Sequence, residues 1–174
     1  MSGVTFTVEF DDREAMAAFG RLAGALRDKR PLLRAIGVGL ASNTRARFNE
    51  GRGPGDVAWA PLNPAYAAIK RGTHILVGSG MSGGLQGSIS FATGSDTVSV
   101  GTNKVYGAIH QFGGTIRPKN AKALRFRLAG GFVFVKQVRI PARPYLGFDD
   151  RDQVTVTEAV EDVLDAAIRG GASP

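Results

Sequence analysis

The spacing of apolar side chains predicts the elements in the first third of the chain. Residues 4–10 (VTFTVEF) alternate apolar and polar side chains, which is typical of a half-buried strand. Apolar residues then recur at helical spacing over 15–26, and Asp11 and Asp12 precede them in positions suited to cap a helix. A second helix is predicted from Pro31 to about residue 48, so we expect the two helices to form a hairpin.

Two glycines, Gly37 and Gly39, lie inside the second predicted helix. Each costs roughly 1 kcal/mol relative to alanine in a helix interior, which weakens the prediction of a helix. Glycines also permit close packing against a neighbouring element. The sequence leaves both interpretations open.

A loop rich in glycine and proline follows the helices. It spans 50–64 and contains the single tryptophan of the chain, Trp59. At its end, the pair Asn63-Pro64 predicts a capped short helix that runs to about residue 70. Residues 79–87 (SGMSGGLQG) then predict a flexible joint.

Two antiparallel hairpins are predicted in the second half of the chain. The first pairs 88–92 with 97–101, and the second pairs 123–128 with 132–138. In the second hairpin, arginines alternate with apolar residues, so one face is expected to be apolar and the other basic. Three phenylalanines are expected to point inward by the same alternation: Phe126, Phe132 and Phe134.

A short helical turn over 105–112, ended by Gly113-Gly114, separates the hairpins, and a last helix is predicted over 154–169. These elements predict a single α+β domain over residues 1–174. It would be a small antiparallel sheet packed by the N-terminal helical hairpin and a C-terminal helix, with long loops and a protruding hairpin. We expect the extended segments 49–64 and 114–140 to be used in assembly.

Charge divides the second half of the chain into two blocks. The net charge is +7, and the stretch 97–148 holds nine cations and no acid, whereas 149–165 holds seven acids against Arg151 alone. Copies of such a chain can meet head to tail, because heterologous contacts join two different surfaces and close into rings. Pairing of the two blocks within one chain is the open alternative. The cations expected in and around the second hairpin are Arg117, Lys119, Lys122, Arg125, Arg127, Lys136 and Arg139.

Few residues are suited to catalysis or metal binding. The chain has no cysteine, and its two histidines, His74 and His110, lie in no metal-ligand or nucleophile-activating motif. A structural hydrogen bond is the expected role of His110, and helix capping is the expected role of the acids at 149, 150 and 152. No apolar run reaches the length of a membrane span. We therefore expect no enzyme activity, no metal, no cofactor and no membrane contact.

Several short motifs together resemble the phage virion morphogenesis or tail-completion family. The two most specific are YGAIHQFGG at 106–114 and IPARPYLG at 140–147, which follow a Trp-x-Pro-Leu loop at 59–62. We expect the matching residues to act in architecture and interfaces. They are Trp59, Leu62, Tyr106, His110, Gln111, Phe112, Gly113, Gly114, Pro141, Arg143, Pro144 and Tyr145.

The resemblance implies a structural virion protein that completes the head-proximal end of a phage tail. It implies a homo-oligomeric ring of six copies that caps the tail tube protein and docks to the head–tail connector proteins. The protein would be assembled in the host bacterial cytoplasm, in the tail or neck of the virion, with contact to packaged DNA left open.

Two questions stay open on the residues themselves. Pro141 and Pro144 restrict the backbone around Arg143, which could present that cation and Tyr145 as an intersubunit anchor or hold a local ion pair. The alternative function is a basic DNA-binding module that acts through non-specific phosphate contacts. Few aromatic residues interleave with the cations, which disfavours a site for stacking single-stranded bases.

Overall fold

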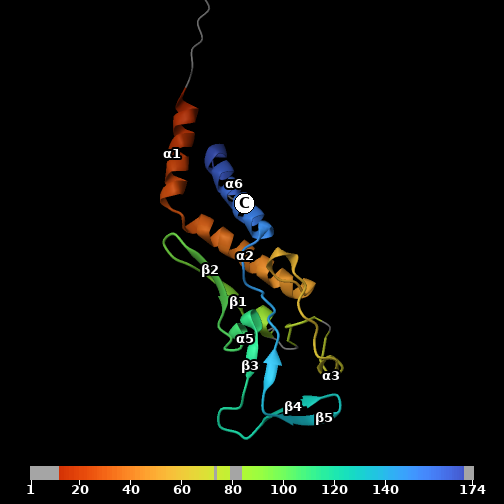
Figure 1. The fold of residues 1–174 in the computed structure, drawn as a ribbon. Coiled ribbons are helices and arrows are strands. Elements are labelled where there is room, and N and C mark those ends of the chain that lie inside the picture. The colour runs from red at the N-terminus through yellow and green to blue at the C-terminus, as the bar shows by residue number, and fades with distance from the viewer. Residues whose placement is uncertain (1–11, 73, 79–83, 171–174) are drawn as a thin grey trace, which may run out of the picture.

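The structure, a computed structural model, describes residues 12–72, 74–78 and 84–170. The predicted strand at 4–10, the cap Asp11 and residues 79–83 of the predicted joint lie outside the described residues. Figure 1 shows an elongated arrangement, with long helices at one end and a small hairpin at the other. The α+β class is confirmed.

Three long helices form the first end of the molecule. They are α1 (Arg13–Arg27), α2 (Arg30–Glu50) and α6 (Asp150–Arg169). The predicted pairing of the first two helices is wrong, because α1 and α2 meet at a bend (Figure 1). The first helix packs on α6, and the second packs on α6 and on the first β-hairpin. Asp28 leaves the helical region, with φ −103° and ψ 90°, and so changes the direction of the chain between them.

The half-buried face of α1, the helix that packs on α6, consists mainly of alanines. Ala15, Ala18, Leu22 and Ala25 are half-buried, while Met16, Phe19 and Leu26 on the other flank of α1 are exposed. Arg21 strengthens this contact, because it donates hydrogen bonds to the carbonyl oxygens of Ala167 and Ile168, at 2.8 and 2.9 Å, near the end of α6. Asp12 takes the N-cap position of α1, but its side chain makes no capping hydrogen bond.

The strands form three separate two-stranded antiparallel ribbons within the described residues, rather than one sheet. The first predicted hairpin is confirmed with a shift of one residue, and the second is confirmed with a shorter second strand. A third pair was not predicted, because its strands are short and far apart in sequence. The ribbons are β1 (Ile89–Thr93) with β2 (Val98–Thr102), β3 (Gly114–Ile116) with β6 (Val138–Ile140), and β4 (Leu124–Leu128) with β5 (Gly131–Val135).

Short helical turns connect the larger elements. Asn63 caps α3 as predicted, since its side chain accepts hydrogen bonds from the amides of Ala65 and Tyr66, but α3 ends earlier than expected. Residues 84–87 of the predicted joint are helical, and the turn before Gly113 begins at residue 107. The short helices are η1 (Pro54–Asp56), α3 (Pro64–Ala67), α4 (Gly84–Gly87) and α5 (Gly107–Phe112).

The two glycines of α2 permit close packing, so this interpretation of them is confirmed. A Cβ atom on Gly37 would lie 2.3 Å from the Phe91 ring of β1, and one on Gly39 would lie 2.3 Å from the methyl group of Thr155 in α6. Each glycine therefore brings the backbone of α2 close to a different neighbour.

We expect Gly37→Ala to lower the free energy of unfolding by about 1–3 kcal/mol, because overpacking against Phe91 outweighs the helix propensity of alanine. Gly20→Ala is the matched control, since no atom lies within 4 Å of its added Cβ in α1. It should raise stability by about 0.5–1 kcal/mol. Denaturant unfolding measures both changes, and a stabilising Gly37→Ala would contradict the packing argument.

Candidate assembly site

A buried arginine joins three segments that are distant in sequence. The Arg47 side chain of α2 is 2% exposed, and its Nη2 lies 2.5 Å from a carboxylate oxygen of Asp152 and 2.9 Å from one of Asp149. Its Nη1 donates to the carbonyl oxygens of Tyr145 and Gly147 at 3.3 and 3.1 Å. The guanidinium therefore ties α2 both to the start of α6 and to the segment before it.

Capping explains the acids at the start of α6, as expected. Asp149 and Asp152 form a capping box, so the helix begins at residue 150 rather than 154. Burial alone would raise the pKa of Asp149, but backbone amides of Gly55 and Asp152 and the charge of Arg47 hold that pKa below its usual value. The role of Arg47 was missed, because an arginine in a predicted helix carries no sequence signal of burial.

The two motifs that carry the family resemblance bind each other. The Gln111 side chain of α5 accepts hydrogen bonds from the amides of Tyr145 and Leu146 at 3.0 Å and donates to the Leu146 carbonyl at 2.8 Å. The amide of Arg143 donates to the carbonyl of His110 at 2.7 Å. Gly113 has φ 70°, and a Cβ there would lie 2.7 Å from the amide nitrogen of Ala142, so this crossing requires glycine.

Arg143 is buried and forms no ion pair with any residue that the structure describes, so neither an exposed anchor nor a local ion pair is found there. It is 5% exposed, and its guanidinium donates to the carbonyl oxygens of Ala60 and Pro61 at 2.7 and 2.8 Å. Trp59 donates in return from Nε1 to the carbonyl of Pro144 at 2.7 Å. The proline-framed segment thus binds the Trp-x-Pro-Leu loop within the same chain.

Tyr145 and Trp59 are core residues. Tyr145 is 1% exposed, and the Phe48 ring lies between it and Trp59 at centroid distances of 5.3 and 5.4 Å. Gly107 lies against the Tyr145 hydroxyl, where an added Cβ would be 2.8 Å from the oxygen. An aromatic side chain in this position stabilises the subunit and is not presented to a partner.

The His110 ring does not make the structural hydrogen bond that we expected, among the residues that the structure describes. The ring meets Tyr106 edge to face at 6.0 Å, but Nδ1 is buried without a hydrogen bond in the described structure. Burial and the positive charge of Arg143 lower the pKa of His110. His74 is exposed, and its Nδ1 lies 3.1 Å from the Asn49 carbonyl oxygen.

The other motif residues lie near the β4–β5 hairpin or at the surface. Leu62, Tyr106, His110 and Pro141 line a cavity of about 760 Å³ that continues along strand β4. Phe112 points to solvent. Residues 114–140 contain the strands β3 to β6. The loop at 49–64 is anchored by Trp59 and by Gly53, whose added Cβ would meet the Pro144 carbonyl oxygen at 2.6 Å.

The seven cations expected in and around the second hairpin are all exposed, and we call them the basic end: residues 117, 119, 122, 125, 127, 136 and 139. The inward orientation predicted for Phe132 and Phe134 is wrong. The strand register pairs Arg125 with Phe134 and Arg127 with Phe132, and paired residues point to the same face. The two rings are 58% and 66% exposed, and Arg125 lies 4.1 Å above the Phe132 ring, whereas Phe126 is half-buried as expected.

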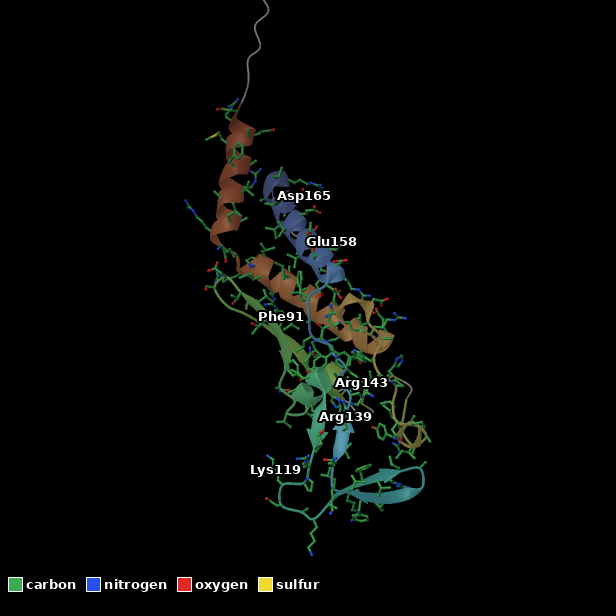
Figure 2. The ribbon with its side chains drawn as sticks, viewed as in Figure 1. Phe91, Lys119, Arg139, Arg143, Glu158 and Asp165 are labelled. Carbon is green, nitrogen blue, oxygen red and sulfur yellow. The ribbon has the colours of Figure 1, made fainter. Side chains whose placement is uncertain are left out.

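The basic end and the acids of α6 lie at opposite ends of the molecule. Figure 2 shows Lys119 and Arg139 at the hairpin end and Glu158 and Asp165 at the helical end. No ion pair joins the two blocks among the described residues, and the ion pairs that α6 does form are with Arg47, with Glu50 and within the helix. The alternative of pairing within one chain is therefore not realised.

Comparison with known proteins decides the family. The model of the phage virion morphogenesis family matches residues 10–165. The chain belongs to this family. It is 32% identical over 157 residues to the Mu-like prophage FluMu G protein 2 of Haemophilus influenzae, covering 90% of this chain and 94% of the relative. It is 30% identical over 165 residues to the putative capsid assembly protein G of Escherichia phage Mu, covering 93% and 96%.

The family resemblance seen in the sequence is thus confirmed, and the chain has a structural or assembly role in a phage virion. No solved structure matches it. Across the described ranges, no helix is long and apolar enough to cross a bilayer. The same ranges hold no group of three or more histidine or acidic side chains arranged to bind a metal ion.

We expect Asp152→Asn to lower the free energy of unfolding by about 3–5 kcal/mol, because it leaves the charge of Arg47 buried without full compensation. Glu50→Gln is the control, since it removes the exposed pair with Arg151 and should cost about 1 kcal/mol or less. Urea unfolding at pH 7 measures both. Equal losses would show that the Arg47 junction does not stabilise the fold.

The lowered pKa of His110 gives stability a pH dependence. The unfolded chain takes up the proton near pH 6.5 and the folded chain at lower pH, so stability should fall as the pH drops below about 6.5, by up to about 1.4 kcal/mol per pH unit. His110→Gln should flatten this part of the curve. Parallel curves for wild type and His110→Gln between pH 6.5 and 5 would contradict the assignment.

Proposed function

We propose that this protein completes the head-proximal end of a phage tail, as a ring of six copies that caps the tail tube and docks to the head connector. Its membership of the virion morphogenesis family supports an assembly role. The observation that carries the proposal is the separation of exposed cations from exposed acids at opposite ends of an elongated subunit (Figure 2).

Opposite charges at opposite ends of the subunit favour self-association through contacts between unlike ends. Two basic ends repel each other, as do two acidic helices, so an isologous dimer through either surface is disfavoured. A contact between unlike ends leaves one free surface of each kind, and repetition of that contact either closes into a ring or extends into a filament. A ring matches the circular end of a tail tube.

The buried network between the two ends supports the same role. Arg47, Arg143 and Gln111 each cross-link backbone segments that are distant in sequence. These contacts hold the helical end and the stem of the hairpin in one relative orientation. A subunit with a defined angle between its two binding surfaces can specify the number of copies in a ring.

Non-specific DNA binding is a second candidate function, and one observation favours it. Phe132 and Phe134 lie on the same face as Arg125 and Arg127, so aromatic rings and cations do interleave on the hairpin. This is the combination that single-stranded nucleic acids bind. The acids of α6 would have no part in such a site, so this function leaves half of the charge pattern unexplained.

We expect the wild-type protein to form six-copy species at low salt that dissociate at high salt, because exposed charges are screened within about 10 Å at 0.1 M ionic strength. Native mass spectrometry and sedimentation at 50 and 500 mM salt measure this. The paired change Arg125→Glu with Arg127→Glu should shift the protein to monomers at low salt. Arg34→Glu with Arg71→Glu is the control with equal change in net charge at exposed positions outside the basic end.

Purified tail tubes and DNA decide between the two functions. Binding of the rings to tube ends supports tail completion. A protein that stays monomeric with and without tubes, and that binds oligonucleotides with a salt-dependent affinity, would replace the proposed function with DNA binding.

A further inference from the structure

The outward face of the β4–β5 hairpin is exposed in the part of the subunit that the structure describes. It carries Arg125 and Arg127 on one strand and Phe132 and Phe134 on the other, all exposed. The hairpin reaches the body of the protein through its inward face and through a backbone hydrogen bond from Ala129 to Ala65 at 3.0 Å. A two-stranded ribbon gains stability when its second face is covered.

One face of α6 has the complementary character. Its residues follow the helical spacing i, i+3, i+4, i+7, i+8 and i+11, and they line a shallow hollow: Asp150, Gln153, Val154, Thr157, Glu158 and Glu161. Three of the six are carboxylates, and none of the three forms an ion pair within the described part of the chain. Val154 in their midst is 54% exposed.

We propose that the outward face of the hairpin docks onto this face of α6 in a neighbouring copy of the same chain. Arg125 and Arg127 pair with Glu158 and Glu161, while Phe132 and Phe134 cover Val154 and the aliphatic parts of its neighbours. This contact rests on the proposed ring, because it names the two surfaces through which the copies meet.

The geometry of the subunit excludes the same contact within one chain. The hairpin lies at the opposite end of the molecule from α6 (Figures 1 and 2), and the two are separated by the β3–β6 ribbon and the core. The acidic face of α6 also favours a protein partner over nucleic acid, because DNA that approached it would be repelled. Each surface thus fits the other on a second copy and nothing else in the described chain.

The absence of cysteine from the sequence allows a direct test by disulfide cross-linking. The double variant Arg127→Cys with Glu158→Cys should give a ladder of covalent oligomers under mild oxidation that a reductant reverses. Each single variant should give no ladder, and a mixture of the two single variants should stop at dimers. Arg71→Cys with Glu158→Cys is the control pair, in which the first cysteine takes an exposed position after α3, outside the hairpin and outside the helices that pack on α6.

A charge exchange tests the same contact without cysteines. Arg127→Glu should weaken self-association at least tenfold, and the addition of Glu158→Lys to the same chain should restore it to within about threefold of wild type. The change Phe132→Ala with Phe134→Ala should also weaken self-association at least tenfold while leaving the circular dichroism spectrum of the folded protein unchanged.

The outcomes separate this contact from the ring itself. Rings that form in Arg127→Glu as in wild type, with no ladder from the cysteine pair, overturn the contact and leave the ring standing. A wild-type protein that is monomeric at low salt overturns both. Loss of binding to a single-stranded oligonucleotide in Phe132→Ala with Phe134→Ala, with self-association unchanged, assigns the face to nucleic acid and overturns the contact.

Discussion

The guanidinium of Arg47 lies where water does not reach it, and the fold around it is arranged to compensate its charge. Two carboxylates and two backbone carbonyls surround it, contributed by the start of α6 and by the segment that precedes α6. A charge buried in this way is stable only with its partners in place, so α2 and α6 have one relative position that satisfies it. The acids that bind Arg47 also cap α6, which couples the start of that helix to the same junction.

Beside this junction, the rest of the core is held together by hydrogen bonds between side chains and the backbone of loops. Gln111 and Arg143 act on carbonyls and amides of loops, and the Phe48 ring fills the space between Trp59 and Tyr145. Segments rich in glycine and proline are held here without regular secondary structure, because side chains satisfy their polar groups. Four residues that we expected to act in interfaces therefore bind one another's segments inside the subunit: Trp59, Gln111, Arg143 and Tyr145.

Local sequence patterns predicted most helices and strands, whereas contacts between distant segments determined which side chains are buried. The helices, both hairpins and the caps at Asn63 and Asp149 followed from spacing and turn residues, which act over a few positions. The burial of Arg143 and Arg47 could not be predicted, because their partners are carbonyls and acids up to about a hundred positions away. The outward position of Phe132 depended on register, which a shift of one residue inverts. The family motifs did not indicate that their residues bind one another within the chain.

The β3–β6 ribbon gives the hairpin a defined mechanical connection to the body. Its two strands leave and re-enter the core beside the two motifs, at Gly114 and at Ile140, and they are paired in register there. Tension applied to the hairpin would be divided between the two strands. It would reach the core where the segments of His110 and Arg143 cross, and there a backbone hydrogen bond joins the two segments. Because Arg143 also binds the carbonyl oxygens of Ala60 and Pro61, a force on the hairpin would reach the Trp59 loop and the core before it reached the helices.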